Sequence, residues 1–123
     1  MFLQNTSIPR LKKNVHLLKN ILWDVEPKQL MESGYKKTDT GIVVKNPLNG
    51  YVFYIETMDN KPGLFVMYHS PACYGETIGR IAEIPEEMLQ EAIRENKGKE
   101  FFRMYPINAA IRQWLKKQFG IPE

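Results

Sequence analysis

The stretch HSPACYGE, from His69 to Glu76, combines the side chains with the most evident chemistry in the sequence. It contains the only cysteine, Cys73, four residues after one of the two histidines. A cysteine acts as a nucleophile through its thiolate, which a nearby imidazolium stabilises. A tight loop that brings His69 close to Cys73 would therefore build a small enzyme or ligand-binding site, with both as candidate catalytic residues.

The same stretch also has a purely structural interpretation. Cys73 fits as a small buried apolar residue, and His69 fits as an ordinary side chain at the end of a strand. No local signature of a cysteine enzyme surrounds Cys73. We therefore expect the structural role, and the sequence favours a protein without enzymatic activity.

Ligands for metals and cofactors are sparse. Zinc requires three or four Cys, His or carboxylate ligands, commonly in paired short spacings, and the sequence offers only His16, His69 and Cys73 as imidazole and thiol ligands. The phosphate-binding motifs G-x-G-x-x-G and G-x-x-x-x-G-K-S/T are missing, as are G-x-S-x-G and H-E-x-x-H. We expect neither a metal nor a cofactor.

Cations and aromatic residues alternate in KEFFRMYPINAAIRQWLKK, residues 99–117. Cations meet phosphates and aromatic rings stack on bases, so this mixture is typical of single-strand nucleic-acid binding. Aromatic residues at helical spacing are equally typical of a core, and the lysines would then form a solvated face. The nucleic-acid candidates from both ends of the chain are Lys12, Lys13, Lys19, Lys99, Arg103, Arg112, Lys116 and Lys117.

The net charge of +3 is unevenly distributed. Residues 1–38 and 96–123 each carry a net charge of +4, whereas residues 76–95 carry −4. A nucleic-acid site would need the two terminal helices to lie side by side, so that charges distant in sequence are pooled. A net charge of +3 attracts a polyanion only modestly.

Length and composition set the broad class. A chain of 123 residues is expected to form one domain, residues 1–123, with a core that needs no disulfide. Apolar residues make up 43% and charged residues 25%, which is ordinary globular usage. No apolar run approaches the length of a membrane span, the N-terminus lacks a secretory signal, and one cysteine fits a reducing compartment. We expect a cytoplasmic protein with no membrane partner.

The N-terminal residues 8–25 are predicted to form an amphipathic helix. Ser7 can cap its first turn, and Pro9 suits a position just inside the start. Apolar residues then recur at spacings of three and four, which places them on one stripe. These residues are Ile8, Leu11, Val15, Leu18, Leu22 and Val25.

Strands follow, rich in β-branched and aromatic residues and separated by turn-forming residues. They are expected at residues 35–38, 42–45, 51–58, 63–69 and 77–84. The short loops join antiparallel neighbours, and Gly79 is a candidate β-bulge within the last strand. The expected product is an antiparallel meander of about five strands.

Two or three helices are predicted at the C-terminal end. One follows Pro85 and opens with Glu86 and Glu87, where carboxylates favour the helix dipole. A further turn is expected at KEFFRMY, and the last helix is expected to run from Pro106 to Gly120. The fold class is therefore α+β, with an N-terminal helix and two or three C-terminal helices packed on an antiparallel meander.

The central strands are apolar on both faces, at residues 51–55 and 64–68. An antiparallel sheet with one wet face should alternate, so either both faces are covered or a second copy covers one of them. With no catalytic or cofactor motif, the sequence favours a small binding module of the inhibitor, immunity, assembly or mobile-element accessory type. A protein partner is the first expectation, and a homodimer and nucleic acid are the others.

Overall fold

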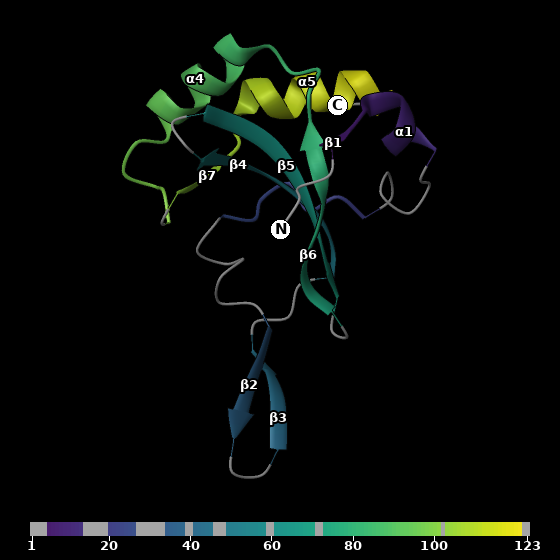
Figure 1. Cartoon of the computed structure of the whole chain (residues 1–123), viewed down its shortest axis with the longest axis vertical. Helices are drawn as coiled ribbons and strands as arrows, with labels where there is room; N and C mark the ends of the chain where they lie inside the picture. The colour runs from purple at the N-terminus through teal and green to yellow at the C-terminus, as the bar shows by residue number, and fades with distance from the viewer. Residues whose placement is uncertain are drawn as a thin grey trace.

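A meander of three long antiparallel strands forms the centre of the molecule (Figure 1). The computed structural model describes residues 5–13, 20–26, 34–38, 41–45, 49–58, 61–70, 73–101 and 103–121. The meander consists of β4 (Gly50–Met58), β5 (Lys61–Ser70) and β6 (Cys73–Ile81). Short strands flank it: β1 (Asn5–Thr6) pairs in parallel with β6, and β7 (Met104–Pro106) pairs antiparallel with β4. The predicted α+β class with an antiparallel sheet is confirmed.

The first two predicted strands form, but not in the meander. β2 (Gly34–Thr38) and β3 (Gly41–Lys45) pair with each other as a separate hairpin, which projects at the bottom of Figure 1. A strand has two edges, and both edges of β4 are occupied along much of their length. One pairs with β5, and the other pairs with β7 and with residues 20–22. The prediction of one continuous five-stranded meander was therefore wrong in this detail.

The N-terminal helix is shorter than its apolar periodicity predicts. α1 spans Ile8–Lys12, begins at Ser7, whose Oγ accepts a hydrogen bond from the Arg10 amide at 3.2 Å, and carries the expected proline. Residues 20–26 are not helical. Instead the Tyr51 amide donates to the Asn20 carbonyl at 2.7 Å, and the Leu22 amide donates to the Tyr51 carbonyl at 2.8 Å. Pairing with the edge of β4 replaces helical hydrogen bonds there, and residues 14–19 lie outside the described part.

Two C-terminal helices cover one face of the sheet, together with α1 (Figure 1). α4 (Glu86–Glu95) begins after Pro85, as predicted. α5 (Ala109–Phe119) begins later than predicted, at Asn108, whose Oδ1 accepts from the Ile111 amide at 3.0 Å, and ends at Gly120 with a φ of 70°. The additional turn predicted at residues 99–105 is not helical: the Met104 amide donates to the Phe101 carbonyl at 3.1 Å in a tight turn, and Met104–Pro106 then form β7 against β4.

Both faces of the sheet are buried within the single chain. On the helix face, Tyr51, Phe53 and Ile55 of β4 pack with Leu64 and Val66 of β5 against the three helices. The opposite face contains the buried residues Val52, Tyr54 and Phe65, with partly buried Leu22, Val25, Met67 and Met104 packed against them. This burial accounts for the two-sided apolar pattern without a second copy, so a homodimer stays a prediction.

Candidate functional site

His69 is buried near the end of β5, with 1% of its surface exposed. Its Nε2 lies 3.0 Å from the Met67 sulfur, and its Nδ1 has no hydrogen-bond partner among the described residues. Burial lowers the pKa of His69 below its ordinary 6.5, because desolvation disfavours the charged ring. At neutral pH the ring is therefore uncharged, and it lacks the positive charge that would stabilise a thiolate.

The β5–β6 register places Cys73 opposite Ser70, whereas His69 pairs with Tyr74. The two residues are thus close in the hairpin but are not directly paired. The side chain of Cys73 lies outside the described side chains. The hypothesis of a His69–Cys73 nucleophile, and the alternative of a structural cysteine, both stay predictions.

Potential metal ligands do not gather in the described part of the structure. No three His, Cys, Asp or Glu side chains there lie together in a manner that could hold a metal ion. None of the described helices combines the length and apolar character needed to cross a membrane.

The basic candidates divide between two ends of the helix layer. Exposed Lys12 and Lys13 lie at the end of α1, which packs beside the C-terminal part of α5, where Lys116 and Lys117 lie (Figure 1). Exposed Lys99 and Arg103 lie on the connection from α4 to β7, on the opposite side of the molecule in that view. The two terminal helices therefore meet as the nucleic-acid hypothesis required, but the candidates do not form one patch. Lys19 lies outside the described residues.

Arg112 and Lys116, on one side of α5, hold the segment 20–26. An Arg112 Nη2 donates to the Trp23 carbonyl at 3.0 Å and to Asp24 Oδ1 at 2.8 Å. The Lys116 ammonium lies 5.5 Å from the centre of the Trp23 ring, a cation–π contact. These two cations therefore already have intramolecular roles, which sequence analysis did not predict.

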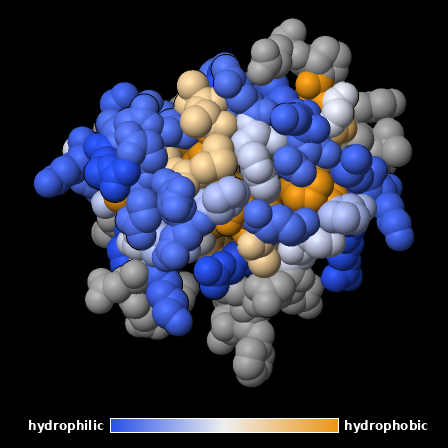
Figure 2. All heavy atoms as spheres, turned by 90° about the horizontal axis from the view of Figure 1, so that it is seen from above, coloured by the Kyte–Doolittle hydropathy of each residue, from blue (hydrophilic) through white to orange (hydrophobic). Residues whose placement is uncertain are grey.

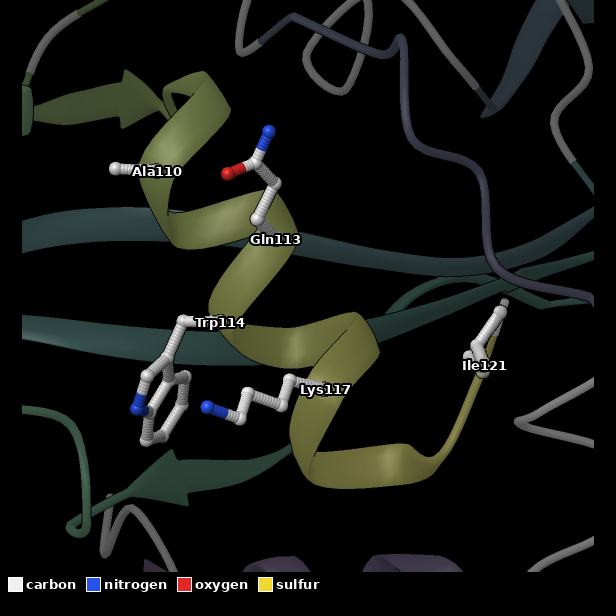
Figure 3. Close-up of a pocket in the computed structure, with 5 residues that line it drawn as sticks. All are labelled: Ala110, Gln113, Trp114, Lys117 and Ile121. Atoms are coloured by element: carbon white, nitrogen blue, oxygen red, sulfur yellow. The ribbon is translucent and has the colours of Figure 1, made fainter. Parts of the chain in front are cut away.

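Another side of α5 forms a hollow of about 510 Å³, here called the α5 groove. Its lining residues are Ala110, Gln113, Trp114, Lys117 and Ile121 (Figure 3). Trp114 is half-buried and packs against the core with one part while it lines the groove with another. In Figure 3 the side chains of Trp114 and Lys117 project to the same side of the helix.

The surroundings of the α5 groove are mainly hydrophilic. Figure 2 shows the helix layer from above, with hydrophobic residues exposed among hydrophilic ones. The lining follows the helix at steps of three and four residues from Ala110 to Ile121, so the groove runs along α5. Sequence analysis left the aromatic residues of 99–117, Trp114 among them, open between stacking on bases and a place in the core, and it named Lys117 as a nucleic-acid candidate, but it did not predict a groove. The only signal was a large aromatic residue beside the buried stripe.

A second hollow of about 380 Å³ lies where β6 leads into α4. Arg80 and Glu86 both line it, so it presents charges of both signs. An Arg80 Nη2 also donates to the Pro62 carbonyl at 3.5 Å. This hollow therefore offers no surplus charge for an anion, and the α5 groove is the better candidate site.

No protein family model, curated protein sequence or solved structure matches this chain. The geometry of the described residues is therefore the basis for a functional conclusion. That geometry provides a groove with a tryptophan on a well-anchored helix, and a buried, uncharged histidine elsewhere.

Proposed function

We propose that the chain is a small non-enzymatic binding module that recognises another protein through the α5 groove. The observation that carries this proposal is the half-buried Trp114 in the lining of an open hollow. Tryptophan is enriched among the residues that dominate protein–protein binding energies, and such residues sit in pockets where the partner excludes water. Ala110 and Ile121 extend the apolar lining on either side of it.

The helix that carries the groove is held rigidly. Ile111, Leu115 and Phe119 are buried beneath it, Asn108 caps its first turn, and the Gly120 amide donates to the Lys117 carbonyl at 3.3 Å. A preformed site loses little conformational entropy when a partner binds. This rigidity supports a role of the chain as an inhibitor, immunity, assembly or mobile-element accessory protein that recognises its partner through α5. The single cysteine supports a cytoplasmic location.

Affinity capture with a matched pair of variants tests the proposal. Ala109 and Ala110 are adjacent and exposed on the first turn of α5, but only Ala110 lines the groove. Bait proteins would be wild type, Ala110→Arg and Ala109→Arg, incubated with nuclease-treated lysate of the source cells, with mass spectrometry of the captured proteins. We expect a protein that wild type and Ala109→Arg retain and Ala110→Arg loses. Equal capture by all three baits, or none, would contradict the proposal.

Nucleic-acid binding is the second candidate, because α1 and α5 lie side by side and pool part of their charge. This alternative predicts retention of single-stranded or double-stranded DNA or RNA that weakens steeply as salt rises, since counterions are released on binding. Filter binding at low and high salt measures this directly. No retention at low salt would eliminate the alternative.

A further inference from the structure

α5, which carries the groove, and α1, which packs against α5, are rich in cations and contain no acidic residue. α1 has the sequence IPRLK and is followed by Lys13, and α5 has the sequence AAIRQWLKKQF. Arg10, Lys12 and Lys13 are exposed on and just after α1, and Lys117 is exposed in the groove lining. Since α1 packs beside the C-terminal part of α5, the positive potential is concentrated at that end of the groove.

The lining itself combines this charge with apolar surface. Trp114, Ile121 and Ala110 present apolar atoms, while Lys117 supplies a cation and Gln113 an amide. An apolar side chain that enters the groove is stabilised in proportion to the apolar surface that it removes from water. A ligand that suits both features carries apolar side chains and negative charges on neighbouring turns.

A polynucleotide fits this surface poorly. A phosphate backbone is bound by a continuous series of cations, and only one of the five lining residues is a cation. α4, which packs against α5, exposes Glu87, Glu91 and Glu95. A strand that continued from α1 toward Lys99 and Arg103 would meet these carboxylates, whereas a short peptide needs only the cationic end.

We infer that the α5 groove takes an acidic, amphipathic segment of a protein partner, an inference that rests on the proposed function. An apolar side chain of the segment packs on Trp114 and Ile121. Its carboxylates face Lys117 and the cations of α1. Electrostatic complementarity of this kind raises the association rate and selects against basic partners.

Fluorescence anisotropy with three synthetic peptides tests the inference on the full chain. The peptides share the same leucine and phenylalanine anchors, and their polar positions are all Glu, all Gln or all Lys. A labelled oligothymidine is the fourth probe. The variants are Lys117→Glu, the double variant Lys12→Glu/Lys13→Glu, and the groove-blocking Ala110→Arg. The controls are Lys97→Glu and Lys99→Glu, which make the same charge change at exposed positions near the other end of the layer, and Ala109→Arg.

We expect the Glu peptide to bind most tightly. Lys117→Glu should weaken it about fivefold, which corresponds to about 1 kcal/mol for an exposed charge pair, and Lys97→Glu should leave it unchanged. Lys117→Ala, with circular dichroism of every variant, separates loss of binding from loss of folding.

Other outcomes overturn the inference in distinguishable ways. If the Gln or Lys peptide binds as tightly and Ala110→Arg abolishes that binding, the acidic partner is wrong while the groove remains a protein-binding site. Tighter binding of the oligothymidine, weakened by Lys117→Glu, overturns the inference in favour of nucleic acid. If no peptide binds, the acidic segment is rejected, and the capture experiment alone decides the proposed function.

Discussion

The two faces of the central sheet are both buried, but they are covered in different ways. Three helices cover the helix face, with partly buried Ile21 and Trp23 packed beside them. The buried residues of this face are aliphatic or aromatic, with Ile55, Leu64 and Ile111 fully buried. The described cover of the opposite face consists of side chains from short edge segments, among them Leu22, Val25 and Met104. That second face also accommodates the buried His69.

The difference indicates which parts of the chain fix the fold and which are held in place by it. Helices bury a continuous stripe and need only local hydrogen bonds, so they can cover a face completely. Residues 20–26 are held by a few specific contacts instead: a bridge to Tyr51, the Arg112 hydrogen bonds and stacking of Trp23 on Phe53 at 5.9 Å. The helix face should therefore contribute most of the free energy of unfolding. Single substitutions that remove a contact of residues 20–26, here called the edge segment, should each lower that free energy only slightly.

The largest effect is expected for Leu115→Ala in the core beneath α5. Leu115 is fully buried among residues from both helices and the sheet. Removing its side-chain atoms leaves a cavity, and the free energy of unfolding should fall by about 2–5 kcal/mol. Chemical denaturation measures this, with exposed Gln113→Ala as the control on the same helix. A loss below about 1 kcal/mol would show that the helix face is not the main core.

The free energy of unfolding should depend on pH through His69, which is buried on the opposite face. Its folded-state pKa is lowered, so the contribution of the neutral ring to stability is complete above pH 6.5 and is lost as the pH falls toward the folded-state pKa. One group changes the unfolding free energy by at most about 1.4 kcal/mol per pH unit. His69→Leu should flatten the decline in this window, whereas His16→Gln should keep it, as urea denaturation at several pH values would show. An equally steep decline in His69→Leu would contradict this assignment.

The edge segment should loosen when its arginine is removed. Arg112→Ala deletes the hydrogen bonds to the Trp23 carbonyl and to Asp24, and the free energy of unfolding should fall by about 1 kcal/mol. Hydrogen exchange should accelerate at the Leu22 amide more than at amides in α4. Arg103→Ala, at an exposed site, is the matched control. Unchanged exchange at Leu22 would mean that pairing with Tyr51 alone holds the segment.

The smallest effect is expected for Lys116→Gln. This change removes the cation from the partly buried Trp23 ring and should cost about 0.5 kcal/mol, the lower end of the range for cation–π contacts. Fluorescence of the two tryptophans and denaturation midpoints would be compared with those of Lys117→Gln. Equal effects of the two changes would remove the distinction between the side of α5 that holds the edge segment and the groove side.

Several local features that depend on residues close together in the sequence were predicted correctly. Ser7 and Pro9 start a helix, Pro85 precedes another, and Gly120 ends the last in the left-handed region. The irregularity predicted at Gly79 also occurs, since Val66 pairs with Gly79 and Met67 with Thr77, which leaves Ile78 as the extra residue. Each of these features depends on residues within a few positions, so its signal lies in the local sequence.

The tertiary structure decided which segments pair, what lies against His69, and which cations meet. Residues 20–26 have a helical apolar pattern, yet the unpaired edge of β4 offers hydrogen bonds that outweigh it, and β7 forms on the same edge for the same reason. The α5 groove likewise depends on how a helix packs. The sequence determined the central strands, the starts of α1 and α4, the end of α5 and the inventory of charges. The rest was decided by competition between segments far apart along the chain, for one edge of β4 and for the two faces of the sheet. The sequence does not reveal the outcome, because contacts between distant segments leave no local pattern.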